Sequence, residues 1–255
     1  MTASHPTTEP SDRRIAVVGD ARHYVGPDLA RMLAVSDHDL VLGDPSDELL
    51  AELEARGASV VAVEGGSRLH RAEASASLAT AAMERFGRID AAVTASGRIM
   101  GGRFVDSTLE QFDDLVTGCL YAPFHFLQAM VPVMVERGSG QILIITSASG
   151  ARPVYGASLY SATRAGANML VRAVAEEVAR KGVQINAVGT NYMDFPEFLA
   201  ATGATDPAVR AEVEAQVPMR RLGRMDEFAE FCRVFLDGRS TFTTGQYVSY
   251  AGGWA

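Results

Sequence analysis

The stretch IAVVGDARHYVGPDLARMLAVSDHDLVL, residues 15–42, decides the fold of this chain of 255 residues. It begins with a continuous apolar run at residues 15–18, passes through a helical pattern at residues 27–35, and ends with a second apolar run at residues 39–42. Strands that are buried on both faces read as continuous apolar runs, and parallel neighbours need a crossover connection, usually a helix. We therefore expect a β-α-β unit at the start of the chain.

The same alternation continues to the end of the chain. Further apolar runs predict strands at residues 59–63, 91–95, 141–146, 183–188 and 246–250. Further segments of helical period lie at residues 48–56, 72–85, 109–134, 159–180 and 226–236. We expect an α/β, Rossmann-like, doubly wound sheet of seven parallel strands in a single domain, with the functional site at the carboxyl ends of the strands. Residues 190–219 lie outside the alternation, as segments that cover a ligand site often do.

Composition and charge narrow the possible partners. A content of 47% hydrophobic residues supports one large core, which we assign to a catalytic domain at residues 13–255 after a polar, disordered tail at residues 1–12. The net charge of −8 argues against nucleic acid as a partner. We identify no signal peptide and no run of about 20 apolar residues, so we expect a cytoplasmic protein without a membrane partner. Cys119 and Cys232 show no metal-binding spacing, so we expect both in the core and no bound metal.

Three residues at the carboxyl edge of the predicted sheet suggest catalysis. Ser147 follows the strand at residues 141–146, and Tyr160 and Arg164 lie on the next helix. Residues four apart share one face of a helix, so Tyr160 and Arg164 are expected to be neighbours. Two hydroxyls can bind a substrate oxygen, and a nearby cation stabilises a phenolate, which would let Tyr160 act as a general base. Taken singly, a strand end, a core tyrosine and a solvated arginine explain these residues; together they predict a catalytic set.

This set resembles that of the short-chain dehydrogenase/reductase superfamily, a serine after strand five followed by Tyr-x-x-x-Lys, with Arg164 in place of the lysine. The resemblance covers nearly the whole chain, including the closing AGGW at residues 251–254, and implies the same fold. The superfamily's glycine-rich turn for the cofactor pyrophosphate is not reproduced. Residues 18–26 read VGDARHYVG, in which only the outer glycines remain, Tyr24 fills the space of the middle one, and Asp20 adds an anion near the phosphate position.

Other positions also depart from a nicotinamide site. Residues 94–97 read TASG where the superfamily has Asn-Asn-Ala-Gly, and Cys119 aligns with its catalytic asparagine. Asp44 is the contrary observation, because an acidic residue at this position would hold an NAD ribose. Residues 44–47, DPSD, also read as an N-cap, a proline at N1 and an acidic N3, and we favour this capping role for Asp44. We therefore expect no cofactor.

The pattern Ser-x12-Tyr-x3-Arg, with an aromatic residue in an altered first turn, resembles the halohydrin dehalogenase family. By this resemblance Ser147 and Tyr160 bind the hydroxyl of a vicinal haloalcohol, and Tyr160, supported by Arg164, removes its proton. The alkoxide then displaces the neighbouring halide, and an epoxide forms. In reverse, a small anion such as azide, cyanide or nitrite opens an epoxide. No redox change occurs, so the resemblance implies no cofactor.

The resemblance also implies a pocket for the substrate and for the halide or nucleophile. Its expected residues are Tyr24, Thr190, Asn191, Tyr192, Met193 and Phe195. Backbone N–H groups of the turn at residues 190–193 could stabilise the departing halide, and Tyr24 would form an aromatic wall in the former nicotinamide space. An ordinary turn at Asn191 and a core position for Tyr192 are the structural alternative. Family members have a proline before the asparagine, where this chain has Thr190.

Two other functions stay open at this point. One is an NAD(P)-dependent short-chain oxidoreductase, and the other is a catalytically silent binding protein on the same fold. The matched pair of Tyr160 and Arg164 argues against the silent protein. Relatives of this fold assemble through their long fourth and fifth helices, so the resemblance implies a homotetramer built on residues 109–134 and 159–180.

Overall fold

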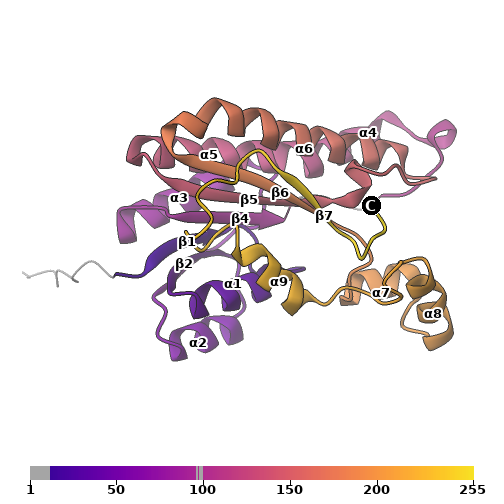
Figure 1. Ribbon diagram of the computed structural model, residues 1–255, viewed down its shortest axis with the longest axis horizontal. Coiled ribbons are helices and arrows are strands. Elements are labelled where there is room, and N and C mark those ends of the chain that lie inside the picture. Colours follow the sequence, from indigo (N-terminus) through magenta and orange to yellow (C-terminus); the bar gives the residue numbers. More distant parts are fainter. Residues whose placement is uncertain (1–11, 96, 98–99) are drawn as a thin grey trace, which may run out of the picture.

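A parallel sheet forms the centre of the computed structural model, which describes residues 12–95, 97 and 100–255 (Figure 1). The strand order is β3-β2-β1-β4-β5-β6-β7. The strands are β1 (Arg14–Val18), β2 (His38–Gly43), β3 (Val60–Val63), β4 (Ala91–Ala95), β5 (Gly140–Ser147), β6 (Val183–Thr190) and β7 (Tyr247–Tyr250). All seven predicted strands are confirmed, and so is the doubly wound α/β architecture of a single domain. Most of the expected tail lies outside the described residues.

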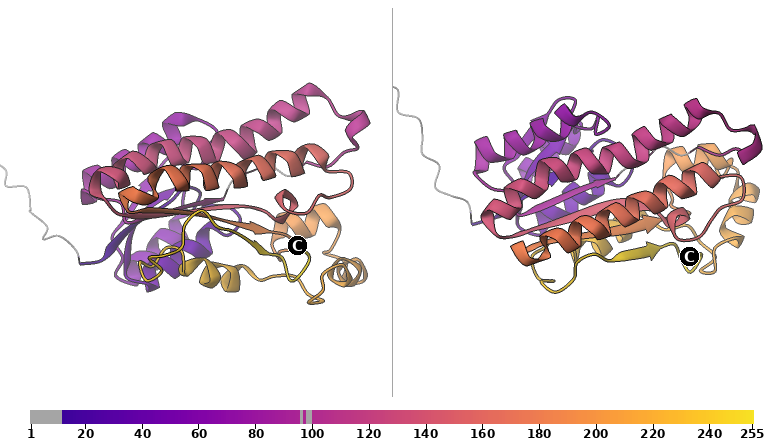
Figure 2. Two further views of the ribbon diagram at one scale, coloured as in Figure 1. Left: turned by 45° about the horizontal axis from the view of Figure 1, so that its top comes forward. Right: turned by 90° about the horizontal axis from the view of Figure 1, so that it is seen from above.

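Helices cover both faces of the sheet (Figures 1 and 2). One layer holds α1 (Gly26–Val35), α2 (Asp47–Ala55) and α9 (Met225–Arg233), and the other holds α3 (Ala72–Phe86), α4 (Leu109–Val116), α5 (Ala122–Arg137) and α6 (Ser158–Val178). Each layer buries its own apolar cluster against the sheet, which includes Leu29 and Phe228 on the first face and Phe126 and Val171 on the second. Because both faces are covered, the strands read as continuous apolar runs.

The helix expected at residues 109–134 is interrupted. A π-helical turn, Thr117–Tyr121, separates α4 from α5, and Cys119 in this turn is fully buried. By length and composition alone the segment Leu109–Arg137 could cross a membrane, although the sequence analysis expected no such run. Its inner residues Phe126 and Met130 lie in the core beside α3 and the sheet. The segment therefore serves as a core helix of this domain.

The segment outside the alternation holds two short helices that the sequence analysis did not predict, α7 (Pro196–Thr202) and α8 (Pro207–Ala215). Both lie beyond the carboxyl ends of the strands (Figure 1). A bridge between Met193 and Gly223 ties the start of this segment to its end. The segment thus covers one end of the sheet, as expected.

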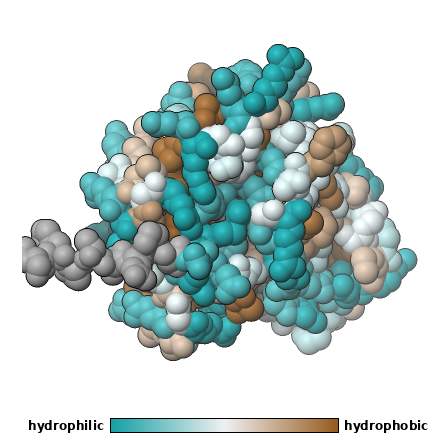
Figure 3. Space-filling model, turned by 60° about the vertical axis from the view of Figure 1, so that its left-hand side comes forward, coloured by the Kyte–Doolittle hydropathy of each residue, from teal (hydrophilic) through white to brown (hydrophobic). Residues whose placement is uncertain are grey.

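The surface seen from the amino-terminal side is mainly hydrophilic, with small scattered hydrophobic spots (Figure 3). Both cysteines, Cys119 and Cys232, are fully buried. Their expected role as small core residues is confirmed.

Candidate active site

Ser147, Tyr160 and Arg164 lie in two elements that meet at the carboxyl edge of the sheet. Ser147 is the last residue of β5, and its Oγ accepts a hydrogen bond from the backbone N–H of Ser149 at 3.2 Å. Tyr160 and Arg164 lie in the first two turns of α6 and are only 8% and 4% exposed. Burying a charged side chain costs free energy unless the charge is compensated. The burial of Arg164 beside Tyr160 therefore indicates a specific role in this site rather than a solvated surface position.

Arg164 and Tyr160 are direct neighbours, as their spacing predicted. The guanidinium carbon of Arg164 lies over the aromatic ring of Tyr160, 4.9 Å from the ring centroid. The guanidinium also lies against Gly97, where a β-carbon would overlap it. Gly97 has a φ of +119°, a conformation that other residues rarely adopt. The glycine after β4 therefore leaves room for the cation, a role that the sequence analysis did not assign.

Two further residues fix the position of this pair relative to Ser147. Asn168 lies one turn after Arg164 on α6, and its Oδ1 accepts a hydrogen bond of 2.7 Å from the hydroxyl of Thr146. The hydroxyl of Tyr247 on β7 donates to the backbone carbonyl of Ser147 at 3.2 Å. Burial raises the pKa of Tyr247, so this hydroxyl stays protonated and able to donate. Neither residue was predicted, because these contacts depend on the packing of β5, β7 and α6.

Tyr24 crosses the crevice above the sheet. Its hydroxyl lies 2.7 Å from the Oγ1 of Thr190, at the carboxyl end of β6, and its ring packs edge-on against Phe195 with 4.7 Å between centroids. Tyr24 follows β1, which is separated from β6 by β4 and β5, a span of about 14 Å at the usual strand spacing. Ligands of open α/β sheets bind in this crevice. Tyr24 therefore closes the space in which a dinucleotide would extend.

Asp20 occupies the backbone donors of the same turn. Its Oδ1 accepts the N–H groups of Arg22 at 2.9 Å and of His23 at 3.1 Å. Such N–H groups at the start of a helix are the donors that bind a cofactor pyrophosphate. Since an internal carboxylate already holds them, and a second anion beside it would be repelled, the turn does not fit a nicotinamide dinucleotide.

Asp44 does not cap α2. Its carboxylate accepts hydrogen bonds from the N–H groups of Gly65 and Ser67, at 2.7 and 3.0 Å, and from the hydroxyl of Ser67 at 2.5 Å. The N-cap of α2 is Ser46, whose hydroxyl accepts from the N–H of Leu49. The capping prediction for Asp44 was therefore wrong by two residues. The carboxylate instead holds the loop after β3, and these contacts outweigh the burial that would raise the pKa of Asp44, so its pKa is lowered.

The expected anion loop after β6 divides into two groups. Thr190 and Phe195 meet Tyr24, as described above. The other three, Asn191, Tyr192 and Met193, line a cavity of about 290 Å³ that also borders residues 249–253. The hydroxyl of Tyr192 donates to Gln216 at 2.9 Å, its N–H donates to the side chain of Asn191, and Met193 is 2% exposed. These contacts of Tyr192 and Met193 are packing contacts and are not made with Tyr24. The N–H of Tyr192 already donates to the side chain of Asn191.

The π-helical turn brings Cys119 to the candidate site. Cys119 and Leu115 form a small buried cluster with Tyr160. Turns of this kind often mark functional sites, and this one places a thiol where the superfamily resemblance implies an asparagine. Part of the loop after β4, including Ser96, lies outside the described residues.

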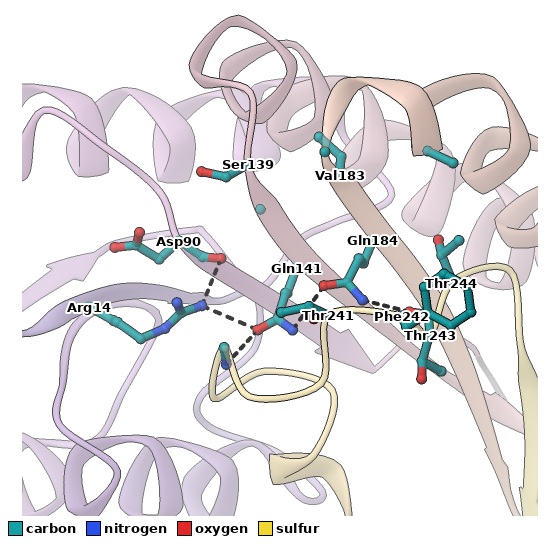
Figure 4. A pocket seen from close by; sticks show the side chains of 14 residues that line it. Arg14, Asp90, Ser139, Gln141, Val183, Gln184, Thr241, Phe242, Thr243 and Thr244 are labelled. Carbon is teal, nitrogen blue, oxygen red and sulfur yellow. Dashed lines mark hydrogen bonds between the residues drawn. The ribbon is translucent and has the colours of Figure 1, made fainter.

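A second cavity, of about 480 Å³, lies at the amino ends of β4, β5 and β6 (Figure 4). The polar side chains on its wall bind one another. Arg14 donates to Gln141 at 3.2 Å, Gln141 donates to Gln184 at 3.3 Å, and Gln184 donates to the carbonyl of Thr243 at 2.9 Å. Because strands run parallel, this edge is the one opposite Tyr160, and the cavity is separate from the candidate site.

The sheet order and the Ser147–Tyr160 pair define a protein of the short-chain dehydrogenase/reductase superfamily, and the comparisons agree. The chain belongs to the family described as enoyl-(acyl carrier protein) reductase, which it matches over residues 21–255. A solved structure described as ElxO with NADP bound has a TM-score of 0.85 at 19% identity, covering 95% of this chain and 98% of that one. At that identity the likeness supports the fold alone.

Curated relatives are similar over nearly their full length. A protein of Streptomyces virginiae, named as a ketoacyl reductase of the monensin polyketide synthase, is 29% identical, covering 95% of this chain and 97% of that protein. The 2,5-dichloro-2,5-cyclohexadiene-1,4-diol dehydrogenase LinX of Sphingobium indicum is 26% identical, covering 95% and 96%. Both names describe oxidoreductases, and neither describes a dehalogenase. The comparisons therefore support membership of this oxidoreductase superfamily.

Proposed function

We propose that the chain is a cofactor-independent halohydrin dehalogenase, a carbon–halide lyase built on this oxidoreductase fold. The observation that carries the proposal is the juxtaposition of a buried Tyr160–Arg164 pair with a dinucleotide crevice closed by Tyr24. The pair would supply a base and its supporting cation, while Tyr24 spans the crevice and Asp20 holds backbone N–H groups of the first turn, where the superfamily's hydride carrier would bind. We infer from these contacts that the site carries out acid–base chemistry without hydride transfer.

We propose the following forward reaction. The hydroxyls of Ser147 and Tyr160 bind the hydroxyl of a vicinal haloalcohol, and Tyr160 as the phenolate takes its proton. The alkoxide oxygen attacks the neighbouring carbon from behind, the carbon–halogen bond breaks, and the halide leaves with the bonding electrons. Arg164 over the ring stabilises the negative charge on Tyr160 before this transfer. The products are an epoxide, a halide ion and a proton.

In the reverse direction, the Tyr160 hydroxyl protonates the epoxide oxygen while an anion attacks a ring carbon. Halide, azide, cyanide or nitrite are the proposed nucleophiles. We place the anion beside Thr190 and Phe195, on the side of the crevice that Tyr24 bounds. The overall charge of −8 opposes long-range attraction of anions, so short-range donors have to hold them.

An NAD(P)-dependent ketoreductase is the second candidate. The curated relatives favour it, because they are named as reductases and dehydrogenases. Ser147 and Tyr160 could serve that chemistry unchanged. It would require Tyr24 to leave the crevice and Asp20 to release the N–H groups of the first turn.

The two candidates are separated by one pair of assays. Purified protein is incubated with a vicinal bromoalcohol, and bromide and epoxide are measured; in parallel, NADH and NADPH oxidation is followed with carbonyl substrates. We expect bromide release without nicotinamide, abolished in Tyr160→Phe and kept in the control Tyr155→Phe, whose side chain is 96% exposed. Nicotinamide oxidation without bromide release would establish the second candidate instead.

We also propose that the chain assembles as a homotetramer through α4, α5 and α6. Large apolar side chains are exposed on and next to these helices, among them Val105 at 79% and Leu109 at 74%, with Phe104, Tyr121 and Met169. Soluble monomers rarely expose such a group of apolar side chains. Burial against the same helices of a second copy would remove these side chains from water.

A further inference from the structure

The hydrogen bond between Tyr24 and Thr190 joins residues 166 positions apart at the centre of the crevice. Tyr24 has a φ of +52°, a left-handed conformation that is uncommon for a residue with a side chain. The edge-on contact with Phe195 and the hydrogen bond to Thr190 hold the ring in this position. Thr190 is itself 8% exposed and lies opposite Ser147 in the ladder between β5 and β6. The two hydroxyls are therefore held rigidly next to the catalytic serine.

One of the two hydroxyl hydrogens of Tyr24 and Thr190 is not used in a hydrogen bond between them. Two hydroxyl groups carry two hydrogens, and a single hydrogen bond between them consumes one. Within residues 12–95, 97 and 100–255, neither hydroxyl has a second hydrogen-bond partner. Whichever group donates to the other, the accepting hydroxyl keeps its own hydrogen and directs it elsewhere. Burial raises the pKa of Tyr24, so the pair retains both hydrogens at neutral pH.

The unused hydrogen lies beside the candidate catalytic serine, because Thr190 is the neighbour of Ser147 across β5 and β6 and Tyr24 is bonded to Thr190. A buried hydroxyl hydrogen without an acceptor costs free energy. An anion bound beside the pair would provide the acceptor and would gain a charge-assisted hydrogen bond.

We propose that the Tyr24–Thr190 pair is an anion-binding device that donates its second hydrogen to the departing halide or the entering nucleophile. The inference rests on the proposed function and adds to it, because it identifies side-chain donors for the anion in addition to the backbone of residues 190–193. Hydrogen bonds to compact anions are the stronger ones, since the same charge is confined to a smaller volume. Removal of the pair is therefore expected to weaken chloride binding more than bromide binding, and bromide binding more than iodide binding.

Bromide binding tests this inference without turnover. The line width of the ⁸¹Br NMR signal is titrated for the wild type, for Tyr24→Phe, for Thr190→Val and for the double variant. Loss of a hydrogen bond to a charged group predicts bromide binding weaker by about tenfold or more in the double variant. Each single variant is expected to bind bromide with an affinity between those of the wild type and the double variant, since the remaining hydroxyl keeps its hydrogen but is no longer oriented by its partner. Thr190→Ser, which keeps the hydroxyl, is expected to bind bromide more tightly than Thr190→Val, and Tyr155→Phe, whose side chain is 96% exposed, is expected to bind as the wild type does.

The outcomes separate this inference from the proposed function. Bromide release and saturable line broadening in the wild type, with broadening lost in the double variant and retained in both controls, support the inference. Unchanged bromide affinity in the double variant would overturn the inference. If the wild type still releases bromide in that case, the proposed function stands. A wild type without bromide release and without line broadening contradicts both. The iodide-to-chloride affinity ratio gives a second readout, because a purely structural role of the pair would weaken all halides alike.

Discussion

Arg164 provides the most quantitative prediction, because its charge is buried and its distance from the catalytic ring is known. Arg164→Gln removes the charge and keeps a polar side chain of similar length. The guanidinium carbon lies 4.9 Å from the Tyr160 ring centroid, and a unit charge about 6 Å from the phenolate oxygen contributes about 3 kcal/mol at an effective dielectric of 20. Loss of this stabilisation predicts a fall in the rate of bromide release on the order of 100-fold at neutral pH.

The assay is the initial rate of bromide release from a vicinal bromoalcohol at one fixed pH. Arg164→Lys serves as the matched variant, since it keeps the charge but lacks the planar group that lies over the ring, and an intermediate rate is expected. Because Arg164 is 4% exposed, the melting temperature of each variant is measured beside its activity. A rate for folded Arg164→Gln within threefold of the wild type would refute the reasoning that Arg164 supports the Tyr160 phenolate.

Three further changes have defined outcomes. Ser147→Ala removes one of the two hydroxyls that bind the substrate oxygen, and kcat/KM for bromide release is expected to fall by about 10- to 100-fold; an unchanged value would exclude Ser147 from the site. Burial alone would raise the pKa of Asp90, but the N–H of Ile15 and the Arg137 guanidinium outweigh it and lower the pKa. Because the pKa of Asp90 is lower in the folded protein than in the unfolded chain, its carboxylate stabilises the fold at a pH above the unfolded pKa. This stabilisation is lost as the pH falls through the folded pKa. Asp90→Asn should therefore destabilise by about 2 kcal/mol at pH 7 in chemical denaturation, with a smaller difference below about pH 4. Leu109→Arg places a charge on the exposed apolar surface of α4, and light scattering should report a smaller assembly than the tetramer proposed for the wild type, whereas an unaltered mass would contradict assembly through this surface.

The sheet could be predicted from the sequence because its signal is local. Each strand is an apolar run a few residues long, and each helix has its own period, so neither depends on distant contacts. The Tyr160–Arg164 contact was predictable for the same reason, since both residues lie on one face of α6. The π-helical turn Thr117–Tyr121 was not, because the sequence reads as one continuous helix and packing against α6 decides where it opens.

The details of the candidate site depend on long-range contacts and could be predicted only in outline. The sequence suggested that Tyr24 occupies the former cofactor space, but the partner of its hydroxyl, Thr190, lies 166 residues away. Asp20 was recognised as an unfavourable anion, whereas its hydrogen bonds to the N–H groups of the turn required the folded loop. Asp44 was misassigned because its partners lie after β3, and no spacing within residues 44–47 indicates them.

The central claim is that the crevice closed by Tyr24 supports halide chemistry without a nicotinamide. It is tested most directly by following bromide release and NADPH fluorescence in the same sample of wild-type protein with a vicinal bromoalcohol. The account predicts one bromide per epoxide formed, at a rate that NADPH does not change, and no saturable NADPH binding up to millimolar concentrations. Saturable NADPH binding at micromolar concentrations, together with no bromide release, would contradict it.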